Sequence, residues 1–377
     1  MFAQRKKQYG VARPSPPEVG LQWPKDAQGT RSSTVTGQVA LAMSMMEEDV
    51  SSAVAVLQER KWRFGYAKHF VRNVELCCRD EQTCLNVARR GLEHLHNTFE
   101  FIRDGKTMTL REAMTTYTGG FADMKVIKGE GQRMGAYKVP YREAAYPRVS
   151  PLIDLTEDTL QKQLEKWVAQ GTIEPSARDA IAAVVKHEDW RDLSDRYFVL
   201  LGAGSAMGPL QVLLALGANV IAIDLDRDFI WKRLIKLARE SAGTLIFPTK
   251  KKASELTTDD ELARNAGANL FTDIPEICNW LSDLMPKEKF TIGGYAYLDG
   301  ERHVRVSLAM DAIMSGVAKR RKTETSLAYL CSPTDVFVVD KETRDAAAEN
   351  YRRKAAPTWL GAVVKLFVKT VRGGAER

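Results

Sequence analysis

The sequence lacks several features that would place the protein in a special class. It has no run of about 18 apolar residues, so no segment is predicted to span a membrane. Its five cysteines are odd in number and include no CxxC pair, which predicts reduced thiols in a reducing compartment rather than a disulfide framework. Long low-complexity tracts are also missing, so most of the chain is expected to be globular.

A large excess of charge of one sign is missing too. The chain carries 55 Lys and Arg against 48 Asp and Glu, a net charge of +7. This balance suits an anionic cofactor but does not predict a nucleic-acid partner. The short basic clusters at 250–252 and 319–322 are interpreted as solvated charge on loops or helix ends.

Targeting features are sparse at the beginning of the chain. No apolar signal segment follows Met1, so a cytoplasmic location is expected. The first seventeen residues are basic and contain no acid, which leaves an organelle matrix as the alternative.

The length of 377 residues exceeds what one hydrophobic core usually supports, so more than one domain is predicted. Proline, glycine, serine and charge dominate the first 36 residues, whereas apolar residues recur at helical spacing from about 37 to 118. The surface of this helical region is a candidate for homo-oligomerisation. The expected organisation is a mostly disordered tail at 1–36, a mainly helical N-terminal domain with a short extended segment at 37–150, a helical connector at 151–195, an α/β domain at 196–345, and a C-terminal helix and tail at 346–377.

From Tyr197 onward, apolar runs typical of buried strands alternate with helical patterns, which predicts a parallel sheet covered by helices. Strands are expected at 197–202, 219–224, 243–248, 289–298 and 325–331, with an extra edge strand as an option at 336–340. Helices are expected at 208–217, 227–241, 274–285 and 303–322. The apolar stretch 356–374 is interpreted as a further helix that packs on the sheet, with a membrane-surface helix as the alternative.

Three glycines follow the first of these strands, at positions 202, 204 and 208. Glycines allow a sharp turn there and let the backbone approach a pyrophosphate, which the N–H groups at a helix N-terminus can bind. The turn is close to the spacing G-x-G-x-x-G, with Met207 in the third glycine position, and close to T-G-x-x-x-G-x-G, but completes neither. The candidate cofactor-binding residues of this turn are Gly202, Gly204, Ser205, Met207 and Gly208.

An acid ends the second strand, about twenty residues after the glycines. Asp224 stands where a carboxylate would accept hydrogen bonds from the ribose hydroxyls of an adenosine and would repel a 2′-phosphate. Its presence favours NAD as the cofactor. Arg227, three residues later, could bind that phosphate and keeps NADP open.

In this order of strand, glycine turn, helix, strand and acid, residues 197–340 resemble the NAD(P)-binding Rossmann-fold oxidoreductase superfamily, and the layout is nearest to the short-chain dehydrogenase/reductase type. The resemblance covers well under half of the chain. It implies a doubly wound sheet in a dinucleotide-binding domain at 196–345. It also implies NAD or NADP as cofactor, and hydride transfer between the nicotinamide and a carbonyl or alcohol group of a small-molecule substrate.

The sequence departs from that type where the chemistry should occur. Short-chain dehydrogenases carry a Tyr-x-x-x-Lys pair on one helix, but residues 303–320 contain no tyrosine. The proton donor is therefore sought in the loops that follow the fourth and fifth strands. The candidates are His303 as general acid or base, Tyr297 as the next donor, and Cys331 as a nucleophile beside His303 or, alternatively, a buried structural thiol.

Two other functions stay open. A non-catalytic scaffold, a redox-sensing or assembly module that binds nucleotide without turnover, would explain the missing Tyr/Lys pair and the large helical region. An S-adenosylmethionine-dependent methyltransferase shares the strand–glycine–helix–strand–acid layout and is less favoured. The spacing of the histidines and cysteines predicts no metal site.

Overall fold

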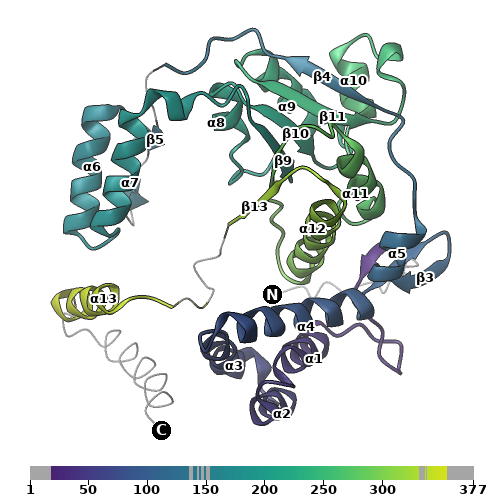
Figure 1. Cartoon of the computed structure of the whole chain (residues 1–377), viewed down its shortest axis with the longest axis vertical. Coiled ribbons are helices and arrows are strands. Elements are labelled where there is room, and N and C mark those ends of the chain that lie inside the picture. The colour runs from purple at the N-terminus through teal and green to yellow at the C-terminus, as the bar shows by residue number, and fades with distance from the viewer. Residues whose placement is uncertain are drawn as a thin grey trace, which may run out of the picture.

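A computed structural model describes residues 18–135, 139–141, 144–145, 148–149, 153–330, 336 and 338–354. Its centre is a six-stranded sheet in the order β13-β12-β9-β10-β11-β4 (Figure 1). Five strands run parallel, and β4 pairs antiparallel with β11 at one edge. The strands are β4 (Asp123–Lys128), β9 (Tyr197–Leu201), β10 (Asn219–Ile223), β11 (Thr244–Thr249), β12 (Phe290–Gly294) and β13 (Thr325–Tyr329). The predicted α/β architecture, with a mostly parallel sheet, is confirmed.

The central strands are continuous apolar runs because both faces of the sheet are covered. Along β9, Val199, Leu200 and Leu201 are all buried although neighbouring side chains point to opposite faces. We name the two faces by what covers them. The local face carries Leu200, Val220, Ala222, Leu245 and Phe247, and the composite face carries Val199, Leu201, Ile221, Ile223 and Ile246.

Helices that follow β9, β10 and β11 in the chain cover the local face. They are α8 (Leu210–Ala215), α9 (Asp228–Arg239) and α10 (Asp259–Asn265). Helix α9 illustrates why these segments are helical and pack on the sheet. Its buried side chains recur at helical spacing and form one apolar face: Trp231, Leu234, Ile235 and Ala238. An acid in its first turn and basic residues in its last turn suit the helix dipole.

The composite face is covered from two distant parts of the chain. Helices α11 (Ile274–Asp283) and α12 (Glu301–Arg320) supply one part of its core. The N-terminal region supplies the other part, through the buried side chains Leu21, Trp23, Phe99, Phe101, Leu110 and Ala113.

The N-terminal region is mainly helical, as predicted, and α1 to α4 form a group that lies beyond α12 in Figure 1. Residues 18–36 are part of the packed structure and not a loose tail, because Leu21 and Trp23 are buried and Ser32 caps α1 by accepting a hydrogen bond from the Val35 amide. The elements of this region are β1 (Gly20–Gln22), α1 (Ser33–Met45), α2 (Val50–Gln58), α3 (Trp62–Cys77), α4 (Glu81–Thr98), β2 (Glu100–Arg103), β3 (Lys106–Thr109) and α5 (Leu110–Thr116).

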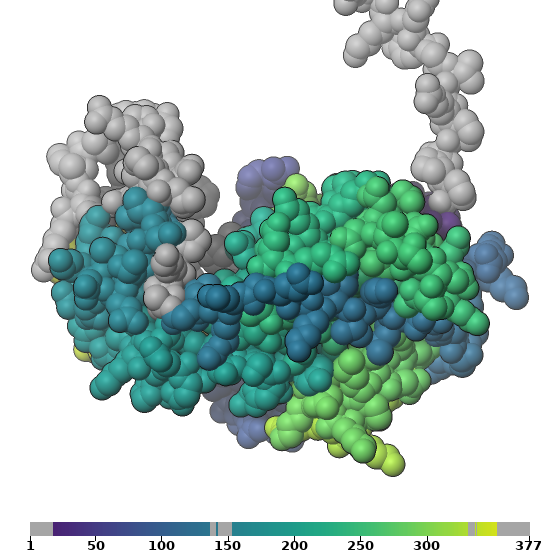
Figure 2. Space-filling view, turned by 90° about the horizontal axis from the view of Figure 1, so that it is seen from above, coloured from purple at the N-terminus to yellow at the C-terminus, as the bar shows by residue number. Residues whose placement is uncertain are grey.

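The segment after α5 leaves the helical region and enters the central sheet. It contains β4, and in Figure 2 it lies in blue along the green strand–helix body. Four backbone hydrogen bonds hold its continuation. The amides of residues 129, 130, 131 and 134 donate to the carbonyls of Gly243, Arg239, Ser241 and Ala215. The extended segment that the sequence places in the N-terminal domain therefore belongs to the sheet.

A helical hairpin of α6 (Glu157–Ala169) and α7 (Pro175–Lys186) lies at one side of the body (Figure 1). A short 3-10 helix, Glu188–Arg191, connects it to β9. Helix α13 (Lys341–Lys354) ends the described part of the chain. Short strands precede the hairpin, with β5 (Val139–Tyr141) paired to β8 (Ile153–Leu155) and β6 (Ala144–Ala145) paired to β7 (Arg148–Val149). Of the optional edge strand at 336–340, the described residues are not in a strand, and the predicted helix at 356–374 lies outside the described residues. Among the helices described, none is long and apolar enough to cross a membrane.

Candidate functional site

The central sheet has one point at which the chain leaves neighbouring strands toward opposite faces. Strands β9 and β12 lie side by side and parallel. Helix α8, after β9, packs on the local face, whereas α12, after β12, packs on the composite face. The two connecting loops therefore diverge at the carboxyl ends of these strands, which is where open α/β sheets bind ligands.

Gly202 begins the loop after β9 and fits the site only as glycine. Its φ of +88° lies in the left-handed region. A Cβ at this position would lie 2.5 Å from the Ala296 nitrogen, in the loop after β12. The amides of Tyr295 and Ala296 both donate to the Leu201 carbonyl at 2.9 Å. The two loops that border the site are thus in backbone contact.

Asp224 is turned toward the glycine loop. Its Oδ2 accepts a hydrogen bond of 2.6 Å from the Gly204 amide, and its Oδ1 accepts one of 2.8 Å from the Leu225 amide. Burial raises the pKa of this carboxyl group, and the two backbone hydrogen bonds oppose that shift. The sequence predicts a ribose-binding acid here. The carboxylate lies at the predicted place and also holds the loop in shape.

Arg233, from α9, is the neighbour that sequence reasoning missed. Its Nη2 donates a hydrogen bond of 2.7 Å to the Gly204 carbonyl. A Cβ on Gly204 would lie 2.9 Å from that nitrogen and 3.0 Å from Asp224 Oδ2, so Gly204 fits between a cation and an anion. Arg227 begins the same helix as its N-cap residue and is exposed. Nothing in the helical pattern of residues 228–239 distinguishes Arg233 from the other basic residues on its surface.

The rest of the glycine turn is open to solvent. Met207 is 70% exposed, Ser205 is half-buried, and the Gly208 amide donates to the Ser205 carbonyl. Within the described part of the chain, the amides of Ala206 and Met207 have no hydrogen-bond partner in the protein. These two N–H groups are available to an anion. Helix α8 begins only at Leu210 and has six residues, so it is shorter than the sequence pattern predicts.

The loop after β12 brings two of the three catalytic candidates together. The rings of Tyr297 and His303 lie with their centroids 4.9 Å apart and their planes tilted by 49°. Tyr297 is exposed, and His303 is half-buried in the first turn of α12. His303 Nδ1 is buried without a hydrogen-bond partner among the described residues. The third candidate, Cys331, lies outside the described residues.

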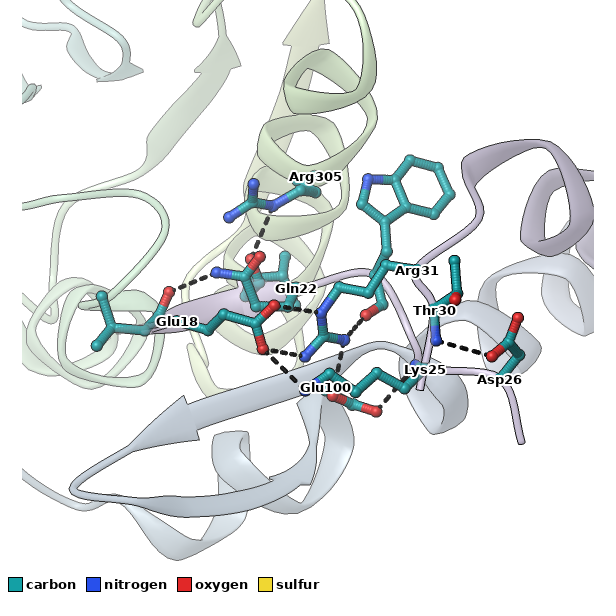
Figure 3. A network of polar contacts seen from close by, with 11 residues as sticks. Glu18, Gln22, Lys25, Asp26, Thr30, Arg31, Glu100 and Arg305 are labelled. Carbon is teal, nitrogen blue, oxygen red and sulfur yellow. Dashed lines mark hydrogen bonds and ion pairs between the residues drawn. The ribbon is translucent and has the colours of Figure 1, made fainter. Parts of the chain in front are cut away.

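The N-terminal region reaches the same end of α12. Trp23 Nε1 donates a hydrogen bond of 2.7 Å to Glu301 Oε2. Arg305 Nε donates one of 2.8 Å to the Leu21 carbonyl (Figure 3). Arg31 forms ion pairs of 2.8 Å with Glu18, which precedes β1, and with Glu100, the first residue of β2. The first turn of α12, which carries His303, is therefore fixed by residues that lie more than 270 positions earlier in the chain.

Two pockets lie elsewhere on the molecule. A pocket of about 440 Å³ lies between α2 and α3, and one of about 360 Å³ lies beside α11 near Thr118 and Trp280. Neither includes a residue of the glycine turn or of the Tyr297–His303 pair. The described residues contain no group of three or more His, Cys, Asp or Glu side chains that could hold a metal ion.

Comparison of the chain with models of protein families, with curated proteins and with solved structures finds no match.

Proposed function

We propose that residues 196–345 form a Rossmann-type, doubly wound domain that binds NAD or NADP, and that the protein is an oxidoreductase acting on a carbonyl or alcohol substrate. The observation that carries the proposal is the position of the glycine turn. It lies at the divergence of β9 and β12, and the acid at the end of β10 is hydrogen-bonded into it. Numbered along the chain from β9, the parallel strands lie in the order 3-2-1-4-5, as in dinucleotide-binding sheets.

The residues present fit a dinucleotide in two respects. The partner-free amides of Ala206 and Met207 can donate to a pyrophosphate. Asp224 keeps lone pairs that can accept from a ribose hydroxyl, although each of its oxygens already accepts one backbone hydrogen bond. Arg227 and Arg233 are both exposed, and Arg233 donates to the Gly204 carbonyl, so either guanidinium could bind a 2′-phosphate. NAD, favoured by the sequence, and NADP both remain candidates.

The chemistry would occur beside the loop after β12. A bound nicotinamide supplies or accepts a hydride there. His303 would hold or deliver the proton at the substrate oxygen, since an imidazole nitrogen can both donate and accept a proton. Tyr297, whose ring contacts that of His303, would orient the substrate or donate in its place. Trp23 and Arg305 would position His303 by fixing the first turn of α12.

Titration of the full-length protein with NADH and with NADPH, followed by nicotinamide fluorescence, tests the proposal. Binding of one of them is expected, and it should weaken at least about tenfold in Asp224→Ala, which loses an ionic hydrogen-bond acceptor. Asp226→Asn is the matched control, because this exposed carboxylate pairs with Lys250 away from the turn. If NADPH binds better, Arg227→Ala and Arg233→Ala should remove that preference. Circular dichroism checks that each variant folds.

Two observations predict a weaker hold on phosphate than a complete glycine turn gives, and they favour a scaffold or sensor over an enzyme that keeps its cofactor in place during turnover. The Gly204 amide is already bonded to Asp224, and α8 is short, so fewer groups are free for phosphate than in a full glycine turn. A scaffold or redox-sensing module predicts binding without turnover. Absence of NADH or NADPH consumption with a panel of aldehydes and ketones, while binding persists, would support it. If neither nucleotide binds, both the oxidoreductase and the nucleotide-binding scaffold are overturned. Titration with S-adenosylmethionine would then test the methyltransferase alternative.

A further inference from the structure

The outward side of α3 is apolar although it is open to solvent. On its inner side, Leu76 packs in the small apolar core that α3 shares with α1 and α2. Phe64 is 85% exposed, the largest exposed fraction of any large apolar side chain in the described part of the chain. Other exposed apolar residues follow it at helical spacing. We call this set the α3 face, and it consists of Phe64, Tyr66, Ala67, Phe70 and Val71.

The charges beside the α3 face are all positive. Residues 60–74 contain five Lys and Arg and no acid. Two of these cations, Lys68 and Arg72, are held in ion pairs with residues that flank α2. The other three, Arg60, Lys61 and Arg63, are exposed and form no ion pair with a described residue. The α3 face therefore joins exposed aromatic and aliphatic side chains to three unpaired cations at one end.

This combination is complementary to the surface of an anionic membrane. Aromatic and aliphatic side chains enter the boundary between head groups and acyl chains, while Lys and Arg side chains reach the anionic head groups. Phe64 projects outward and lines neither of the two pockets described above. A fluid lipid layer can accept such a protruding ring without a preformed cavity.

Two other occupants fit the face less well. A symmetric contact with a second copy through Phe64 would bring the cations Arg60, Lys61 and Arg63 of both copies together, and like charges repel. Single-stranded nucleic acid could stack its bases on the rings, but the unpaired cations lie at one end of the face and do not follow a groove along it.

We propose that the α3 face docks the protein on the surface of a membrane that contains anionic lipids. Helix α3 would lie in the plane of the membrane, with Phe64 and Phe70 among the lipid head groups and Arg60, Lys61 and Arg63 beside the anionic lipids. The arrangement needs no membrane-spanning segment. It uses none of the residues proposed for nucleotide binding, so the two functions can be tested separately.

Flotation of the full-length protein with lipid vesicles tests the proposal. Vesicles of phosphatidylcholine and phosphatidylserine at about 3:1 are compared with vesicles of phosphatidylcholine alone, in about 0.1 M salt. The mixed vesicles should bind the protein at least about tenfold better, because each cation near an anionic surface raises the affinity severalfold. This preference should shrink as the salt concentration rises.

The cations and the apolar side chains can be tested separately. The combined variant Arg60→Gln/Lys61→Gln/Arg63→Gln should bind mixed vesicles at least about tenfold more weakly. Phe64→Ser should weaken binding to both kinds of vesicle about fivefold or more, because it removes the ring that inserts. Circular dichroism checks that both variants fold. Substitutions of exposed residues elsewhere are the matched controls and should change little: Lys251→Gln/Lys252→Gln/Lys287→Gln for the cations and Phe229→Ser for the ring.

Several outcomes would overturn the proposal. The first is no binding of the unchanged protein to mixed vesicles. The second is equal binding by the unchanged protein and by both α3 variants, as expected if residues 356–374 were the only contact with the membrane. A dimer that Phe64→Ser separates, measured by light scattering, would assign the face to a second copy. An oligonucleotide bound in the absence of vesicle binding, and released by the charge variant, would assign it to nucleic acid.

Discussion

The two faces of the central sheet are built in different ways. The local face is covered by α8, α9 and α10, which lie next to their strands in the chain. The composite face has α11 and α12, but its core also needs Leu21, Phe99, Phe101 and Leu110 from the N-terminal region. The difference shows that the strand–helix part of the chain does not complete its own core. The N-terminal region is part of the same folding unit, and through β1 it also fixes the helix that carries His303.

The largest effect should come from removing a buried aromatic ring from the composite face. Phe101 is fully buried in β2, opposite Leu21 of β1. Phe101→Ala should lower the free energy of unfolding by about 3–5 kcal/mol, the usual cost of deleting a buried phenylalanine ring. If both faces fold as one unit, differential scanning calorimetry should show a single transition at lower temperature. Phe247→Ala, on the local face, is the matched control and should shift the same transition. Two separate transitions would mean that the N-terminal region is an independent domain.

A smaller effect is expected from Arg321, the residue that follows α12. Its guanidinium donates to the carbonyls of Leu281, Leu284, Met285 and Glu288, and it lies 3.8 Å from the centroid of the Phe290 ring. Arg321→Met would leave those carbonyls without their donor and should cost about 2–3 kcal/mol. Chemical denaturation measures the loss. Lys322→Met, which removes an exposed neighbouring cation, should change little. Similar losses in both variants would contradict the structural role of Arg321.

Arg321 also shows where sequence reasoning fails. The sequence predicts that the basic cluster at 319–322 is solvated, yet one of its four residues, Arg321, is buried. Its partners are backbone carbonyls in the last turn of α11 and in the loop that follows it, and a backbone carbonyl is present at every residue, so the sequence does not mark these positions. Asp224 is similar: the sequence places an acid at the end of β10, but only the fold shows that the carboxylate bonds to the Gly204 amide.

The central strands of the sheet could be predicted well, because the apolar pattern that predicts each strand lies within the strand itself. Strands β9, β10 and β11 are buried on both faces, so each is a short apolar run between turns, and their predicted bounds agree within two residues. Strand β1 could not be predicted in this way. It has three residues, and its burial depends on Phe101, Phe271 and α12, far along the chain. Leu21 and Trp23 are apolar residues in a stretch otherwise rich in proline, glycine and charge, and they show no periodicity that would predict their burial.

Acid should weaken the helical region that completes the composite face. Glu59, at the end of α2, accepts hydrogen bonds from Lys68 and from the Lys61 amide, which lower its pKa from 4.5 to about 2. A folded-state pKa below the unfolded value means that this stabilisation is present above about pH 4.5 and is lost as the pH falls toward 2. Burial lowers the pKa of the neighbouring His69, so its protonation destabilises the fold in the same direction.

Thermal unfolding followed by circular dichroism from about pH 6 to pH 2 measures this acid sensitivity. Glu59→Gln should be less stable than the unchanged protein near neutral pH, and its thermal stability should fall less when the pH is lowered below about 4.5. Glu75→Gln removes a more exposed carboxylate on α3 and is the comparison variant for the loss of one negative charge. The same slope in Glu59→Gln and in the unchanged protein would rule out Glu59 as a source of the acid sensitivity.

The smallest effect should come from the polar contact that joins α4 to α12. His96 Nε2 lies 2.7 Å from Asp311 Oδ2, and both side chains are partly buried. Asp311→Asn keeps the shape but replaces a carboxylate with an amide, and it should lower the free energy of unfolding by about 1 kcal/mol. Glu93→Gln, which removes an exposed ion pair to Arg89 within α4, should cost less, because surface pairs contribute only about 0.3–0.5 kcal/mol. A double-mutant cycle with His96→Ala assigns the coupling to this pair. If the cycle shows no coupling, α4 and α12 are held together by apolar packing alone, and the helical group contributes to the composite face without a specific polar link.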